Sequence, residues 1–134
     1  MPSERPIVVD GANVAYIEQT QDGKPKMSNL VAVREALEQK GFNPIIIVDA
    51  SLIYEIDDPD QLQAFLDNQR IHQAPADTEA DYFVLETAGE KDAQVVSNDR
   101  FEEYSQRFEW VEDRRVPLMI INGEVQLYEP KLDQ

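Results

Sequence analysis

The sequence predicts a single α/β domain over residues 1–134, with a mostly parallel central sheet, helices on both faces and an antiparallel hairpin near the C-terminus. Short apolar runs alternate with stretches of helical periodicity, which is typical of parallel strands joined by helices. Residues 117–128 place an Asn-Gly pair between two short runs, and this pair is a strong hairpin signal. The length fits one domain with one sizeable core.

Three apolar runs predict buried strands, and polar side chains follow each of them. The runs are residues 7–9, 45–48 and 94–97, while residues 71–72 form a short connection or a brief strand. Asp10 and Asp49 directly follow the first two runs, and Asp99 follows the third after Asn98. The carboxyl ends of parallel strands meet at one edge of a sheet, where ligands bind in such folds.

Four helices are predicted between and after these strands from capping residues and apolar spacing. Ser28 is the expected N-cap of a helix through Lys40, and Asp58 with Pro59 begins the next one. Asp77 is expected to cap a third helix that runs to about Ala88. The fourth helix would span residues 101–108, because Phe101, Tyr104 and Phe108 share one helical face.

Composition excludes several classes of function. The chain has no cysteine, so disulfides, thiolate nucleophiles and zinc–thiolate sites are absent. No apolar run approaches the roughly 20 residues of a membrane span, and the N-terminus lacks a signal-peptide core, so we expect a cytoplasmic protein. The net charge of −15 argues against broad electrostatic binding of nucleic acid. It reflects either a solvated surface or carboxylates concentrated around a metal.

The residues alone predict a metal site at the sheet edge. Taken by itself, the segment from Asp10 to Asn13 is either a strand-ending turn or part of such a site. Asp81 and Asp99 reach the same edge from separate elements, and Asp77, four residues before Asp81, would share its helix face. Clustered carboxylates raise one another's pKa unless a cation offsets their charge. Oxygen ligands favour Mg²⁺ or Mn²⁺, and such a site suits phosphodiester hydrolysis.

The chain resembles the NYN-domain ribonucleases of the PIN-like nuclease group. The resemblance is strongest to their Regnase-type branch, known from CCCH zinc-finger ribonucleases. Four segments carry the resemblance in the family's order. They are residues 7–15 (IVVDGANVA), 80–84 (ADYFV), 95–101 (VVSNDRF) and 118–123 (LMIING). The first and third are specific motifs. Together they span nearly the whole chain.

The resemblance implies a PIN-like three-layer sandwich and a Mg²⁺-dependent endoribonuclease that acts on single-stranded RNA. Its active-site core would be Asp10, Asn13, Asp81 and Asp99. Ala80 stands where the branch has the first of two adjacent aspartates, and Asp77 or Glu79 is a candidate substitute. Glu103 stands where an aspartate is common and keeps the charge. The full predicted metal set is therefore Asp10, Asp81, Asp99, Glu103 and Asp77.

Three basic residues are candidates for RNA contacts: Lys24 and Lys26 in a polar loop after the first motif, and Arg100 beside Asp99. One alternative is a PIN-like domain that binds RNA or protein without cutting, which the charge of −15 and Ala80 favour. A phosphoacceptor receiver domain is a third reading, but residues 117–123 lack the lysine it needs. RNA preference, the number of metal ions and the oligomeric state, including a homodimer, stay open.

Overall fold

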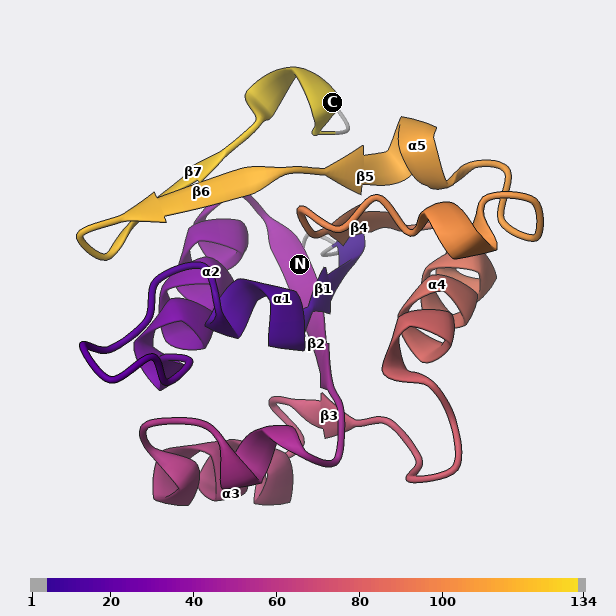
Figure 1. Cartoon of the computed structure of the whole chain (residues 1–134). Coiled ribbons are helices and arrows are strands. Elements are labelled where there is room, and N and C mark those ends of the chain that lie inside the picture. The colour runs from indigo at the N-terminus through magenta and orange to yellow at the C-terminus, as the bar shows by residue number, and fades with distance from the viewer. Residues whose placement is uncertain (1–4, 133–134) are drawn as a thin grey trace.

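A five-stranded parallel sheet with the order β3-β2-β1-β4-β5 forms the centre of the protein, as Figure 1 shows for the computed structural model. The structure describes residues 5–132. The strands are β1 (Arg5–Asp10), β2 (Phe42–Val48), β3 (His72–Gln73), β4 (Gln94–Val96), β5 (Arg115–Val116), β6 (Leu118–Ile121) and β7 (Glu124–Leu127). The helices are α1 (Gly11–Ala15), α2 (Met27–Gln39), α3 (Pro59–Asp67), α4 (Ala80–Lys91) and α5 (Val111–Arg114), with short 3₁₀ turns at Leu52–Tyr54, Glu102–Tyr104 and Glu129–Lys131.

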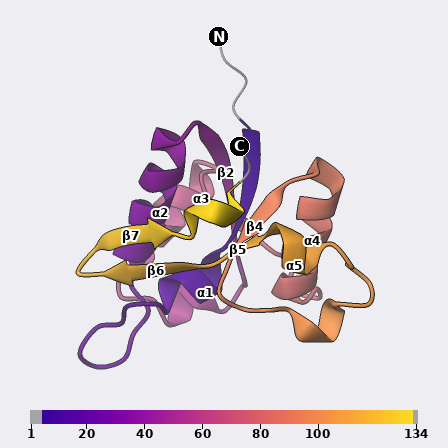
Figure 2. The same cartoon turned by 90° about the horizontal axis from the view of Figure 1, so that it is seen from above.

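Helices cover both faces of the sheet, as the view from above makes plain (Figure 2). Successive side chains of a strand point to opposite faces, so Ile7 and Val9 of β1 join the core beneath α2, while Val8 joins the core beneath α4. All three residues are fully buried. The antiparallel hairpin β6–β7 packs on the α2 side. The predicted α/β sandwich with its C-terminal hairpin is confirmed.

The order of the strands creates a crevice at the carboxyl end of β1. The chain leaves β1 for β2 and β3 on one side, then crosses through α4 to β4 and β5 on the other side. Connections on either side of β1 therefore diverge at this point, and ligands bind at such switch points in open α/β sheets. Among residues 5–132, no helix combines the length and apolar character that a membrane crossing requires.

Helix α1 was not predicted, because its five residues are too few to show a helical period. It begins at Gly11, directly after β1, and passes close to β2. A Cβ atom at Gly11 would lie 2.6 Å from Cγ1 of Val48 and 2.7 Å from the backbone oxygen of Ile47. Only glycine allows this approach, so the Gly11 of the first motif has a packing reason.

Helix α2 begins two residues earlier than predicted, at Met27, and Ser28 is not its N-cap. The N-cap position is Lys26, whose side chain makes no capping bond. Instead, the backbone N–H of Met27 donates to the carboxylate of Asp57 at 2.8 Å. A residue 30 positions away thus replaces the local cap, and a sequence pattern cannot reveal it.

Helix α4 begins at Ala80, two residues later than predicted, and its N-cap is Glu79 in place of Asp77. A turn precedes the helix, in which the backbone N–H of Thr78 donates to the oxygen of Pro75. Asp77 therefore lies in a loop and shares no helix face with Asp81. The helix also runs three residues past the predicted Ala88, until Asp92 takes a left-handed conformation.

The predicted helix over residues 101–108 is wrong. Phe101 has a φ of +52°, which is incompatible with a helical start, and only the 3₁₀ turn at Glu102–Tyr104 forms. The Asp99 carboxylate accepts from the backbone N–H of Phe101 at 2.8 Å and supports this bend. Strand β5 was also not predicted, since two residues leave no pattern.

Candidate functional site

Three carboxylates meet at the crevice beside β1. Asp10 ends β1, Asp81 is the second residue of α4, and Asp99 lies in the loop after β4. Their oxygens lie within 4.8 Å of one another, and no other group of this kind occurs in the described part of the chain. They line a hollow of about 300 Å³, which we call the acidic hollow, with Ala12, Asn13 and Tyr16.

Asp10 is the buried member of this cluster, with 5% of its surface exposed. Its Oδ2 accepts a hydrogen bond of 2.9 Å from the Ser97 hydroxyl, while the backbone N–H of Asn13 lies at the limit of bonding, 3.5 Å from Oδ1. Burial raises the pKa of Asp10 from 3.8 to about 7, aided by the charge of Asp81 and opposed by the Ser97 bond.

Ser97 bonds the carboxylate of Asp10 and the backbone of Asp99. It is fully buried, and its hydroxyl oxygen accepts from the backbone N–H of Asp99 at 3.0 Å while its proton goes to Asp10. The backbone oxygen of Ser97 accepts from the guanidinium of buried Arg115 at 3.2 Å. Strand β5 therefore supports the site from behind, through an arginine that the sequence did not single out for this role.

Asp81 stands between two hollows. The second, of about 270 Å³, is lined by Asp49, Glu79, Ala80, Asp81, Glu103 and Tyr104, and we call it the side hollow. Burial, then the charges of Asp99, Glu103, Glu79 and Asp49, raise the pKa of Asp81. Negative potential is thus concentrated along both hollows, and an added cation would relieve it.

Asn13 joins the elements that carry the cluster. Its side-chain oxygen accepts from the backbone N–H of Asn98 at 3.0 Å, which ties α1 to the loop after β4. The side chain of Asn98 in turn bonds the backbone of Leu118 twice, at 2.8 and 2.9 Å. Within residues 5–132, the side-chain NH₂ of Asn13 donates to no protein group, so it stays available to a ligand in the acidic hollow.

The remaining predicted site residues lie at different distances from the cluster. Glu103 lines the side hollow, whereas Asp77 is exposed and lines neither hollow. Arg100 is exposed directly after Asp99. Lys24 and Lys26 belong to the loop between α1 and α2, and this loop projects away from the sheet in Figures 1 and 2.

The predicted site left out four residues: Asp49, Tyr16 and Tyr104 line the hollows, and buried Ser97 bonds Asp10 without lining either hollow. Asp49 follows β2 at the same sheet edge, so the strand-end pattern could have included it. Nothing local marks the other three, because their partners lie far away in the sequence. Larger hollows of about 540 and 330 Å³ occur elsewhere, but neither is lined by a carboxylate.

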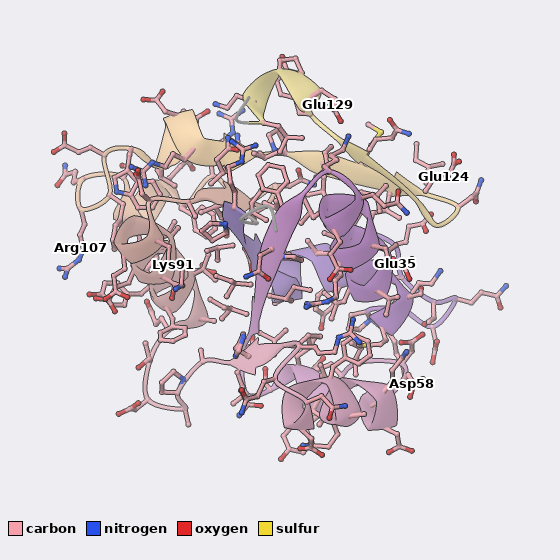
Figure 3. The ribbon with its side chains drawn as sticks, turned by 180° about the vertical axis from the view of Figure 1, so that it is seen from behind. Glu35, Asp58, Lys91, Arg107, Glu124 and Glu129 are labelled. Atoms are coloured by element: carbon pink, nitrogen blue, oxygen red, sulfur yellow. The ribbon has the colours of Figure 1, made fainter. Side chains whose placement is uncertain are left out.

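Acidic side chains also cover the rest of the surface. Glu35, Asp58, Glu124 and Glu129 are exposed on separate elements and project outward in Figure 3. The surface is broadly acidic, and a local concentration of carboxylates exists at the sheet edge.

Comparison with known proteins agrees with this geometry. The profile of the Zc3h12a-like ribonuclease NYN domain matches residues 3–133. No curated protein matches the chain. A crystal structure of nuclear proteinaceous RNase P 2 (PRORP2) from A. thaliana is similar in fold, with a TM-score of 0.72 and 23% identity over 93% of this chain. A second structure of Arabidopsis thaliana PRORP2 has a TM-score of 0.74 and 22% sequence identity over 97% of this chain.

The chain spans 29% and 31% of those two PRORP2 chains, so the likeness concerns one part of a larger protein. At sequence identities of 22–23%, the likeness to PRORP2 shows a shared fold. The family profile covers nearly the whole chain and carries the assignment. The chain therefore belongs to the Zc3h12a-like ribonuclease NYN domain family.

Proposed function

We propose that this protein is a metal-dependent endoribonuclease that hydrolyses phosphodiester bonds of single-stranded RNA. Membership of a ribonuclease family supports nuclease activity. The observation that carries the rest is the meeting of Asp10, Asp81 and Asp99 within 4.8 Å at the switch point of the sheet. Such a cluster is costly without a cation, and it lies where a substrate can enter from solvent.

The residues fit a hard divalent cation. All three groups offer carboxylate oxygens, which suit Mg²⁺ or Mn²⁺. Burial, and after it the charges of neighbouring carboxylates, raise the pKa of Asp10 and of Asp81, and a bound cation would favour the charged form of both groups. Asp10, Asp81 and Asp99 would hold the ion directly or through water, and Glu103 would extend the acidic shell. Bound there, the ion would lower the pKa of a water molecule and offset charge on the phosphate oxygens.

The other residues of the site would position these groups and the substrate. Ser97 bonds the Asp10 carboxylate, and the backbone N–H of Phe101 bonds the Asp99 carboxylate, so both carboxylates have a donor before any ligand binds. Asn13 lines the acidic hollow, and its NH₂ would donate to a phosphate oxygen there. Arg100, next to Asp99, would contact a flanking phosphate. Lys24 and Lys26 would meet RNA further along the strand.

A cleavage assay on circular single-stranded RNA tests the proposal, because only an endonuclease can open a circle. The purified protein is incubated with Mg²⁺, with Mn²⁺ and with EDTA, beside a matched linear RNA and a duplex. We expect cleavage that needs the metal and favours the single-stranded forms. Asp10→Asn and Asp99→Asn should each abolish it, since each removes a charge from the cluster.

Asp60→Asn is the matched control, because Asp60 is an exposed aspartate in the first turn of α3, outside both hollows. It should cleave like the wild type. Cleavage that survives chelation, or survives both site substitutions, would contradict the mechanism. RNA binding without cleavage under either metal would instead support the non-cutting module, with Ala80 in the side hollow as the departure to examine.

A further inference from the structure

Two tyrosines line the two hollows of the site, one in each. Tyr16 lines the acidic hollow and Tyr104 lines the side hollow, and among the described residues each is the one aromatic side chain that lines its hollow. The two hollows meet at Asp81, which lines both. Each hollow therefore combines an aromatic ring with carboxylates, and the two hollows share one carboxylate.

Both rings are anchored by their hydroxyl groups. The Tyr16 hydroxyl donates to Oε1 of Glu55 at 3.3 Å, and the Tyr104 hydroxyl donates to Oε1 of Glu79. Neither acceptor belongs to the three-carboxylate cluster. The bonds restrict both rings without consuming a carboxylate of that cluster, so less side-chain freedom is lost when a ligand packs on the rings.

The rings are also accessible. Tyr16 is 38% exposed, although it belongs to the wall of a hollow, and Tyr104 is partly exposed. Tyr104 further packs near Tyr82, with ring centroids 6.4 Å apart, so its ring is supported from one side. An exposed aromatic face at an acidic site has little to offer a phosphate, but it suits the apolar face of a base.

We propose that Tyr16 and Tyr104 stack the bases on the two sides of the cleaved phosphate, so that the groove accepts unpaired RNA. This inference rests on the proposed ribonuclease activity and gives a reason for its preference. Bases in a duplex are already stacked on their neighbours and cannot reach the rings, whereas a single strand can turn its bases outward. It also explains how so acidic a chain holds RNA, since stacking needs no positive charge.

The experiment uses an RNA with one cleavage site and a set of copies in which a single nucleotide near that site is abasic. Tyr16→Ala and Tyr104→Ala should each lower kcat/KM on intact RNA by roughly 5- to 150-fold, the range of one lost base stack. For each variant there should be one abasic RNA on which it has the same kcat/KM as the wild type. The abasic nucleotides of the two RNAs so identified should lie on opposite sides of the cleaved bond. Duplex cleavage should change little in either variant.

Tyr16→Phe and Tyr104→Phe keep the rings and should retain most of the activity. Tyr128→Ala is the control, because Tyr128 is 53% exposed and lies on neither hollow. Thermal unfolding of every variant separates lost stacking from lost folding. The inference is overturned if the alanine variants lower kcat/KM equally on intact and abasic RNA. It is also overturned if Tyr128→Ala lowers kcat/KM as much as they do.

A failure of the proposed function would be visible separately. If the wild type cuts no RNA, binding is followed with an oligonucleotide that carries 2-aminopurine, whose fluorescence is quenched by stacking. Quenching that the wild type shows and both alanine variants lose would support stacking without cleavage. The absence of quenching in the wild type would overturn it.

Discussion

The Ser97 hydroxyl donates a hydrogen bond of 2.9 Å to the Asp10 carboxylate, across 87 positions of sequence. The same oxygen accepts from the backbone N–H of Asp99. One buried side chain therefore links the carboxylate at the end of β1 to the backbone of the loop after the neighbouring strand β4.

Replacing this serine tests the arrangement. Ser97→Ala should weaken metal-dependent activity by about 10- to 100-fold, the usual effect of removing a group that orients a metal ligand. The Ser97 bond lowers the pKa of Asp10, so its loss should raise that pKa further and move the rising limb of the pH–rate profile to higher pH. Steady-state rates across pH and Mg²⁺ concentration provide the measurement. Ser28→Ala, at an exposed serine of α2, should leave the metal-dependent activity and the pH–rate profile unchanged.

The buried Asp10 predicts an unusual dependence of stability on pH in the metal-free protein. Its pKa is raised from 3.8 to about 7, so the folded state binds this proton more tightly than the unfolded state. The free energy of unfolding should therefore fall as pH rises from about 4 to about 7, by up to about 4 kcal/mol from this group. Urea unfolding in EDTA at several pH values measures the effect.

Asp10→Asn isolates the contribution of Asp10, because the amide does not titrate. The difference in unfolding free energy between this variant and the wild type should grow in favour of the variant across the same pH window. A constant difference would contradict the raised pKa.

Metal binding should release protons below neutral pH. A cation binds the deprotonated carboxylates, and Asp10 is largely protonated in the metal-free protein at pH 6. Calorimetric titration with Mg²⁺ at pH 6, in two buffers of different ionisation enthalpy, should show a release approaching one proton. At pH 8.5 the release should be close to zero. Equal heats in both buffers at pH 6 would contradict the prediction.

Two glycine substitutions should change stability in opposite directions. Gly11→Ala places a Cβ atom 2.7 Å from the backbone oxygen of Ile47, which cannot rotate away, and should destabilise the protein by about 1–3 kcal/mol. Gly89→Ala lies within α4, where the added Cβ is 3.4 Å from the Trp110 ring, and should stabilise by up to about 1 kcal/mol. Chemical denaturation of both variants measures the difference. Equal effects would argue against the close approach of α1 to β2.

The sequence predicts those elements whose signal is local. The apolar runs of β1, β2 and β4 and the Asn-Gly turn of the hairpin are patterns within a few residues, and the structure has all four. The meeting of Asp10, Asp81 and Asp99 follows from strand order, because strand ends and helix starts share one edge.

The sequence could not predict features that depend on distant partners. The start of α2 depends on Asp57, and the bend at Phe101 depends on a carboxylate that also faces the acidic hollow. Asp77 was expected on a helix face because aspartate is a good N-cap, but the turn at Pro75 delays the helix until Ala80. In each case a tertiary contact or a turn outweighs the local propensity.

The hydrogen bonds of the cluster divide its members into two kinds. Asp10 and Asp99 are fastened to Ser97 and to the backbone of Phe101, whereas no donor within residues 5–132 bonds the Asp81 carboxylate. Two of the three carboxylates are thus held by hydrogen bonds, and the third, in the first turn of α4, is not. We expect such a site to bind ions of somewhat different radius. Which of Mg²⁺ and Mn²⁺ it binds would then depend on the concentration of each ion more than on the geometry of the site.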